Sequence, residues 1–392
     1  MQDAWARLLT ELGPPPFLVT ATQIKSLTGV EPRLATKFDH REARPQALRE
    51  ATILPVRNGE YVVLPGDGYH DLESSGGRII SYRVAPEVRA RTATLPWTSP
   101  PSSESQVLDM ALVSGMLAEF LGEERLFLTI RGRLRAPRFG FTFAGEALEA
   151  EGVQVEADAG VEGDSLYLIE AKLGTRDNFH VRQLYYPFRM WRESCAKPVL
   201  PVFCCHSDRV FHFWLYDFAP ADNYHGLTLR RAASYTLEED VGTPTLRNLL
   251  DAYPRGALPA LPFPQADRLE RVIDLADAVA SGASEYGFIP RQEGYYRNAA
   301  AFLGLLDPEF TQGTRAQRHA AILKRLVELP VFREACEYMD EHARFPPRPW
   351  VAERILANTS LRGTTLERRA GTVLAWLQWL STHTLVAHNR TT

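Results

Sequence analysis

The sequence has few cysteines and no long apolar run, and both absences narrow the classes of protein that it encodes. Its four cysteines, Cys195, Cys204, Cys205 and Cys336, show no CxxC spacing and no repeated pairing with histidine, which argues against a zinc site and a disulfide framework. No apolar segment approaches the ~20 residues that span a bilayer. The first residues contain acids and no small-residue cleavage site, unlike a secretion signal. We therefore expect a cytoplasmic protein without a membrane partner.

The chain also lacks internal repeats, low-complexity tracts and a strong charge of one sign. Its net charge of −4 does not indicate a nucleic-acid partner, although a locally basic cleft would suffice to bind one. A hydrophobic content of 45% and a charged content of 23% are typical of globular proteins. Its 392 residues exceed one ordinary core, so we expect two or three domains.

Residues 1–75 have the pattern of a winged-helix-like module that could bind DNA. Three helical patterns, the third over residues 44–51, precede two β-branched runs that flank Asn58-Gly59, a strong hairpin signal. The same order also suits a small α/β cap or a protein dock, because fold alone does not determine function. The cations that would contact phosphates are Lys25, Arg33, Lys37, Arg41, Arg44 and Arg57.

Residues 100–230 predict an α/β core in which helices sandwich a mixed sheet. An amphipathic helix over residues 103–122, with Gly122 as its stop, precedes a run of strand patterns, a second helix and further apolar strands. Residues 230–264 are less regular and predict a linker. The segment 265–392 is helical and ends in a helix-turn-helix pattern, which places Arg368 and Arg369 where a recognition helix contacts the major groove.

The stretch from residue 153 to residue 189 carries the chemistry. Glu170 and Lys172 end a mostly apolar strand and share one face of it, because side chains alternate along a strand. Burying both would be costly without a metal or a partner. Asp158 on the preceding strand supplies a second carboxylate, and two acids suffice for Mg²⁺. Lys172 would position or activate a water, and Gln183 on the next helix would assist by hydrogen bonding.

Two alternatives stay open within this stretch. Glu156 shares the face of Asp158 and competes with it as the first metal ligand, although we favour Asp158 because Gly160 lets a substrate approach its strand end closely. The triplet of Glu170, Ala171 and Lys172 also occurs on ordinary salt-bridged strand edges.

The series Asp158, Glu170-Ala171-Lys172 and Gln183 resembles the PD-(D/E)xK nuclease superfamily. The segment QLYY is similar to the glutamine-tyrosine motif of its RecB-like members, although Pro187 departs from their tyrosine spacing. The resemblance implies a restriction-endonuclease-like fold and a Mg²⁺ ion, for which Mn²⁺ can substitute. It also implies an acid from the helix before the sheet. The candidates for that acid are Glu104, Asp109 and Glu119, and Glu119 ranks first.

The flanking segments, among them KFD, NGEY, RQEGYY and ERRAGTVLAWLQWL, resemble bacterial type II restriction endonucleases with helix-turn-helix additions. This resemblance implies sequence-specific cleavage of double-stranded DNA, with a partner DNA methyltransferase that protects the host. A homodimer would suit cleavage of both strands at a palindrome. The alternatives are a structure- or damage-directed repair or defence nuclease and a non-catalytic DNA-binding regulator.

Overall fold

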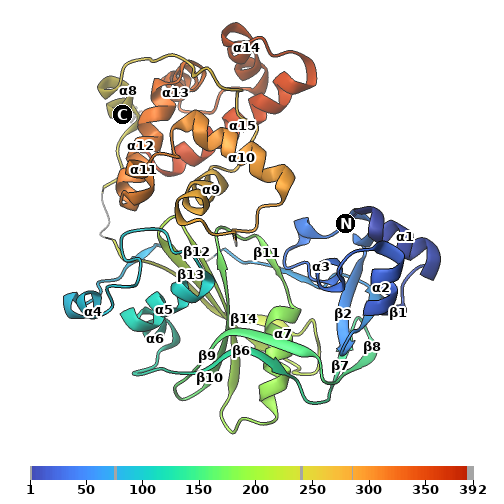
Figure 1. Cartoon of the computed structure of the whole chain (residues 1–392). Coiled ribbons are helices and arrows are strands. Elements are labelled where there is room, and N and C mark those ends of the chain that lie inside the picture. The colour runs from blue at the N-terminus through green and yellow to red at the C-terminus, as the bar shows by residue number, and fades with distance from the viewer. Residues whose placement is uncertain (1, 75–76, 239–241, 285, 386–392) are drawn as a thin grey trace.

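The computed structural model describes residues 2–74, 77–238, 242–284 and 286–385. A mixed α/β body holds a seven-stranded sheet, with an N-terminal module beside it and a helical C-terminal region at one end (Figure 1). No helix among the described residues combines the length and the apolar character needed to cross a bilayer.

The N-terminal module packs three helices on a three-stranded antiparallel sheet of order β1-β3-β2. Its elements are α1 (Gln2–Leu12), β1 (Phe17–Thr20), α2 (Ala21–Thr28), α3 (Pro32–Thr36), β2 (Ala51–Arg57) and β3 (Glu60–Pro65). Thr20 ends β1 and also caps α2, because its hydroxyl accepts a hydrogen bond from the amide of Gln23. Trp5 and Ile24 are fully buried in the core beneath these helices.

The third helix of this module is not where the sequence pattern predicts it. Residues 44–51 form no α-helix, and the region holds only two 3₁₀ turns, η1 (Arg41–Ala43) and η2 (Gln46–Leu48). Ala51, the last residue of the predicted helix, is the first residue of β2 and pairs with Pro65 of β3. The short α3 supplies the third helix instead. β1, which the sequence pattern does not predict, has only four residues and depends on pairing with β3.

The central sheet has the strand order β5-β14-β13-β12-β10-β9-β6. Its strands are β5 (Ile80–Ser81), β6 (Phe127–Arg135), β9 (Gln154–Glu162), β10 (Leu166–Leu173), β12 (Val199–Ser207), β13 (Val210–Phe218) and β14 (Leu227–Thr236). β10 pairs parallel with β12 and antiparallel with β9, so the sheet is mixed. Two small ribbons flank it: β4 (Tyr69–Asp71) with β11 (Asn178–His180), and β7 (Phe139–Phe143) with β8 (Glu146–Ala150).

Helices cover both faces of this sheet. α7 (Arg182–Arg192) packs on one face, together with Leu168 of β10. α5 (Glu104–Ser114) and α6 (Met116–Leu121) pack on the other face, together with Ile169 and Ala171. The sequence pattern predicts one helix over residues 103–122, but Gly115 adopts φ +86° and divides it into α5 and α6. The short α4 (Pro86–Arg91) lies before this pair in the chain.

The predicted linker over residues 230–264 is partly ordered structure. β14 runs to Thr236 and pairs with the whole of β13, and α8 (Leu246–Ala252) follows. Both arginines of β14, Arg230 and Arg231, are exposed, and its sequence lacks the apolar run that marks the inner strands.

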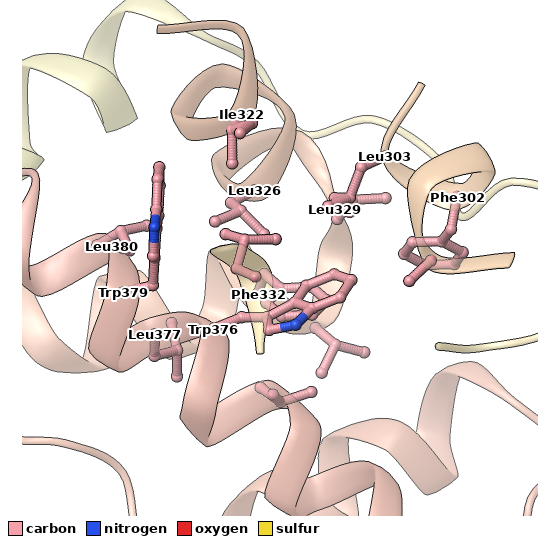
Figure 2. Close-up of a cluster of buried hydrophobic side chains, with 14 of the residues drawn as sticks. Phe302, Leu303, Ile322, Leu326, Leu329, Phe332, Trp376, Leu377, Trp379 and Leu380 are labelled. Atoms are coloured by element: carbon pink, nitrogen blue, oxygen red, sulfur yellow. The ribbon is translucent and has the colours of Figure 1, made fainter. Parts of the chain in front are cut away.

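The C-terminal region has its own apolar core. Its helices are α9 (Leu269–Ser281), α10 (Pro290–Leu303), α11 (Pro308–Gln312), α12 (Arg315–Glu328), α13 (Pro330–His342), α14 (Arg348–Asn358) and α15 (Gly363–Thr382). Figure 2 shows Trp376 of α15 lying against Phe332 of α13, and the two ring centroids are 5.4 Å apart. The indole of Trp376 also donates a hydrogen bond to the carbonyl of Ala266. These contacts join the last helix to the segment that enters α9.

A buried group of charges, which we name the interdomain charge cluster, joins the sheet to the helical region. It consists of Asp208 in the β12–β13 turn, Asp277 on α9, and Arg315, Arg318 and His319 on α12. Asp208 pairs with His319 and with Arg315 at 3.2 Å. Arg318 is fully buried, 3.0 Å from Asp277 and 3.8 Å from Asp208.

Asp274 of α9 forms a second link between the helical region and the sheet. It contacts the residues that directly follow β10, the strand that carries Lys172. Its carboxylate accepts hydrogen bonds from the amide of Thr175 at 2.7 Å and from the hydroxyl of Ser207 at 2.6 Å. Gly174 lies between β10 and this contact, and a Cβ atom there would approach Tyr286 to 3.0 Å. The helical region therefore holds the turn that ends β10.

Candidate active site

The end of β10 presents a lysine between carboxylates. Glu170 and Lys172 lie on one face of the strand, and each side chain is 11% exposed. The Lys172 ammonium donates hydrogen bonds to Glu170 at 2.6 Å, to the carbonyl of Ala171 at 3.0 Å and to Glu104 at 3.2 Å. The lysine is therefore held in one place by three oxygen acceptors, two of them carboxylates.

Asp158 reaches this group from the neighbouring strand. The paired register of β9 and β10 ends at Ala159 and Ile169, and beyond it a side-chain oxygen of Asp158 accepts the amide hydrogen of Ala171 at 2.9 Å. Glu156, the competing ligand, lies two residues earlier in the same cleft. Its carboxylate pairs with Arg133 at 3.2 Å and with Arg33 at 3.9 Å. The geometry brings Asp158, and not Glu156, to the strand end beside Lys172.

The structure places Glu104 beside Lys172, whereas Glu119, which ranks first from the sequence, lies apart from this group. Glu104 is the first residue of α5, which packs on β10 and points its N-terminal end at Lys172. Glu119 is exposed on α6, beyond the break at Gly115, on the side of Tyr82 and Tyr235. Asp109 pairs with Arg131 on β6. Glu119 lies away from Lys172 because the left-handed conformation of Gly115 turns α6 away from the end of β10.

Gln183 lies on α7, as predicted from the sequence, and faces the same group. Its amide nitrogen donates a hydrogen bond to Glu170. Its amide oxygen is buried and has no hydrogen-bond partner within the described chain. Tyr186, one turn further, donates to the carbonyl of Pro55 and thereby ties α7 to the N-terminal module. Gln183 therefore orients Glu170 and retains one buried acceptor that no described residue satisfies.

The site carries more negative charge than Lys172 offsets. The pKa of Glu170 is raised to about 8: burial is the largest cause, Lys172 opposes it, and the charges of Asp158 and Glu104 add to it. Burial acts to lower the pKa of Lys172, but the surrounding carboxylates, Glu170 first, hold it well above its usual value. The ammonium therefore stays charged, and one carboxyl group holds a proton unless a cation is bound.

This donor set fits a hard divalent cation. Asp158 and Glu170 offer carboxylate oxygens, the ligands that Mg²⁺ prefers, and the excess negative charge favours a cation over a neutral ligand. No group of three or more His, Cys, Asp or Glu side chains with metal-binding geometry occurs among the residues that the structure describes. Mg²⁺ needs only one or two protein carboxylates, because waters and substrate phosphates complete its shell.

The raised pKa of Glu170 predicts a pH-dependent stability without metal ions. Because its folded pKa exceeds the usual 4.5, Glu170 contributes stability that is full below pH 4.5 and is lost as pH rises through about 8. We expect Glu170→Gln to melt a few degrees above the wild type at pH 8.5 in EDTA, since about 1 kcal/mol shifts the Tm by roughly 2–4 °C. The two proteins should melt together at pH 5. Thermal unfolding at both pH values tests this, and equal Tm values at pH 8.5 would contradict it.

A cleft of about 720 Å³ opens over these residues. One of its walls comes from β9, β10 and α7, and the other comes from α3 and the tip of the β2–β3 hairpin. Its cationic lining residues are Arg33, Lys37, Arg57, Arg133, Lys172, Arg176 and Arg182. Its acidic lining residues are Asp39, Glu104, Glu156, Asp158 and Glu170. The cleft is therefore net positive in a protein whose net charge is −4, and it favours a polyanion.

The predicted DNA-binding cations are not all at this cleft. Lys37 lines it, whereas Lys25 is exposed elsewhere on the module and pairs with Glu31 at 3.6 Å. Arg41 pairs with Asp67 and Asp71. On α15, Arg368 is exposed, and Arg369 is half-buried and donates a hydrogen bond to Gln265. Arg41 and Arg369 thus have structural partners, while Lys37 and Arg368 extend into solvent.

Among the charged residues that line the cleft, sequence reasoning missed Asp39, Arg133, Arg176 and Arg182. Arg182 precedes Gln183 in the first turn of α7, so the periodicity of that helix could have indicated it. Asp39 comes from the N-terminal module, more than 130 residues before Lys172 in the chain, and carries no local signal.

Comparison with known families divides the chain into three matched segments. Residues 14–63 match a domain of unknown function (DUF6996), residues 65–236 match another (DUF6997), and residues 273–384 match a third (DUF7226). No significant match was found among curated proteins or among solved structures.

Proposed function

We propose that the protein is a Mg²⁺-dependent endonuclease that hydrolyses phosphodiester bonds of double-stranded DNA, of the type II restriction class. The arrangement of Asp158, Glu170, Lys172 and Gln183 in a net positive cleft is the observation that carries this proposal. Paired carboxylates beside a lysine suit hydrolysis of a phosphodiester, and the cationic walls suit a DNA backbone.

The order of the elements supports a restriction-endonuclease-like core. α5, β6, β9, β10, α7 and β12 follow one another around the site, with β10 and β12 parallel and the helices on opposite faces. The N-terminal order of helix, strand, two helices and a hairpin supports a winged-helix-like module, and α14 with α15 supports a helix-turn-helix.

The side chains have separate roles in this proposal. Asp158 and Glu170 would hold Mg²⁺, or Mn²⁺ in its place, and the bound ion would stabilise negative charge on the scissile phosphate. Lys172 would donate a hydrogen bond to the attacking water or to a phosphate oxygen, from a position set by Glu170 and Glu104. Gln183 would keep the Glu170 carboxylate in one orientation.

A homodimer would suit cleavage of both strands at a palindrome, because its symmetry supplies two active sites. A methyltransferase that modifies the same DNA sequence would then protect the host. This partner is functional and need not bind the nuclease.

Incubation of the purified protein with plasmid and phage DNA tests the function. We expect discrete fragments in Mg²⁺ or Mn²⁺ and intact DNA in EDTA. Products from branched or single-stranded DNA without sequence preference would indicate a repair or defence nuclease instead. Tight binding to one sequence without cleavage in any divalent metal would indicate a regulator and would rule out the proposal.

A further inference from the structure

The N-terminal module forms one wall of the cleft in which Glu170 and Lys172 lie. α3 contributes Arg33 and Thr36 to the lining, and the hairpin between β2 and β3 contributes Arg57 at its tip. Both elements line the same cleft as the carboxylates of β9 and β10. The module is therefore placed to contact any substrate that reaches Lys172.

The segment that follows α3 is fastened to the ribbon of β4 and β11 on both sides of Asp39. The carbonyl of Phe38 accepts a hydrogen bond from the hydroxyl of Tyr69 at 2.9 Å. The carbonyl of Asp39 itself accepts from the amide of His180 at 3.0 Å. The amide of Arg41 donates to the side chain of Asn178 at 2.7 Å. These bonds fix the backbone of Asp39 just before the start of α7.

Asp39 is one of the residues that line the cleft. One of its carboxylate oxygens is buried and has no hydrogen-bond partner in the described chain, and the nearest cation, Arg182, is 4.0 Å away. Burial acts to raise the pKa of Asp39, but the positive charges of Lys172, Lys37 and Arg182 hold it below its usual value. Asp39 is therefore a charged acceptor that acts electrostatically on Lys172 without touching it.

The cations of this wall are suited to phosphates that flank the scissile bond. Lys37 is exposed and makes no ion pair within the described residues, and Arg57 is 59% exposed and pairs with Glu60 only at 3.4 Å. Such exposed cations can replace a weakly held partner or water by a phosphate at little cost in free energy. A cleft of about 720 Å³ lies in the range of roughly 300–1,000 Å³ that encloses a molecule of drug size. A cleft of this size has room for a few nucleotides of one strand and not for a whole duplex.

We propose that the N-terminal module is a structural part of the active site, in which Lys37 and Arg57 bind the phosphates next to the scissile bond and Asp39 positions Lys172. This inference rests on the nuclease function proposed above. Asp39 is a positioning residue because it touches neither Lys172 nor the reacting phosphate in this arrangement. The strand would pass between the module and the sheet, so the module would bind the DNA that is cut and not a separate site.

The test of the wall measures DNA binding at several salt concentrations, in Ca²⁺ and with the DNA checked for integrity. We expect Lys37→Gln and Arg57→Gln each to weaken binding about threefold to tenfold and to reduce the salt slope by about 1, since each removes one phosphate contact. Arg7→Gln, an exposed cation on α1 away from the cleft, is the matched control and should bind as the wild type does. If both cleft variants show the same salt dependence of DNA binding as the wild type, Lys37 and Arg57 do not bind phosphates and this part of the proposal is wrong.

The test of Asp39 measures the rate of DNA cleavage and the affinity for DNA separately. We expect Asp39→Asn to reduce the single-turnover cleavage rate about tenfold to 100-fold without weakening DNA binding or changing the Tm, and Asp39→Glu to recover part of the rate. Cleavage by Asp39→Asn at the wild-type rate would overturn its positioning role. If the wild type cuts no DNA, the proposed function fails together with the role of Asp39, and the salt slopes still decide whether the module forms a DNA-binding wall.

Discussion

Replacement of Lys172 by methionine is expected to reduce the rate of DNA cleavage by about 10²–10⁴-fold, the usual contribution of one positioned proton-transfer or charge-stabilising group. The substitution keeps most of the apolar stem and removes only the ammonium, which is the donor to Glu170 and Glu104. DNA binding in Ca²⁺ should change by less than the rate, because the cations of the cleft walls remain.

The matched control is Lys197→Met. Lys197 belongs to the same domain and also pairs with a glutamate, Glu162 at 2.9 Å, but its side chain is 42% exposed and lies outside the cleft. We expect it to cleave as the wild type does. Because the loss of Lys172 leaves Glu170 without its cation, a double variant that adds Glu170→Gln provides a check on folding. Wild-type cleavage by Lys172→Met would show that the reaction occurs elsewhere.

Replacement of Arg318 by methionine is expected to destabilise the protein by about 3–5 kcal/mol, the cost of removing one partner from a buried ion pair. Arg318 is fully buried in the interdomain charge cluster, and its removal leaves Asp277 and Asp208 without its charge. The guanidinium carbon of Arg318 also lies 5.0 Å from the centre of the Phe310 ring, and methionine removes this cation–π contact as well.

The stability that Arg318→Met loses should be larger at high pH than at low pH. Burial raises the pKa of Asp277 to about 6 even with Arg318 nearby, so its protonated form contributes stability that is lost as pH rises from about 4 through 6. Without Arg318 the carboxyl group is neutral over a wider range. Urea unfolding should therefore show a smaller deficit at pH 5 than at pH 8.

Arg325→Met provides the control on the same helix. Arg325 is partly exposed and pairs with Glu328 only at 3.9 Å, so its removal should cost less than about 1 kcal/mol. The double variant Arg318→Met with Asp277→Asn should recover part of the lost stability, because it removes a buried charge left without a partner. Equal unfolding free energies for the two single variants would contradict a stabilising role for the cluster.

The core of the site could be predicted because its signal is local. Glu170 and Lys172 end a strand of apolar residues, and this contrast is visible without any tertiary information. Asp158 follows from the turn that joins β9 to β10, since adjacent strands bring their ends together. Gln183 follows from the helix that begins after β11.

The remaining residues depend on features that no local pattern encodes. The choice between Glu104 and Glu119 depends on the backbone of Gly115, which has helical residues on both sides. Asp39 reaches the cleft because a separate module is fastened to β11 by hydrogen bonds across more than 130 residues. β14 is recognisable only beside β13, because its own sequence contains arginines where inner strands have apolar residues.

The hydrogen bonds of Asp274 limit where this chain can be cut or joined to another protein. Its carboxylate is the acceptor for Thr175 and Ser207, yet it belongs to α9, beyond the proline-rich segment that connects the sheet to the helices. A chain cut in that segment would keep Glu170 and Lys172 but would lose the acceptor that fixes the end of their strand. The modular boundary in the sequence is therefore not a boundary of function, and a chimera with a new helical region must inherit α9 together with the sheet.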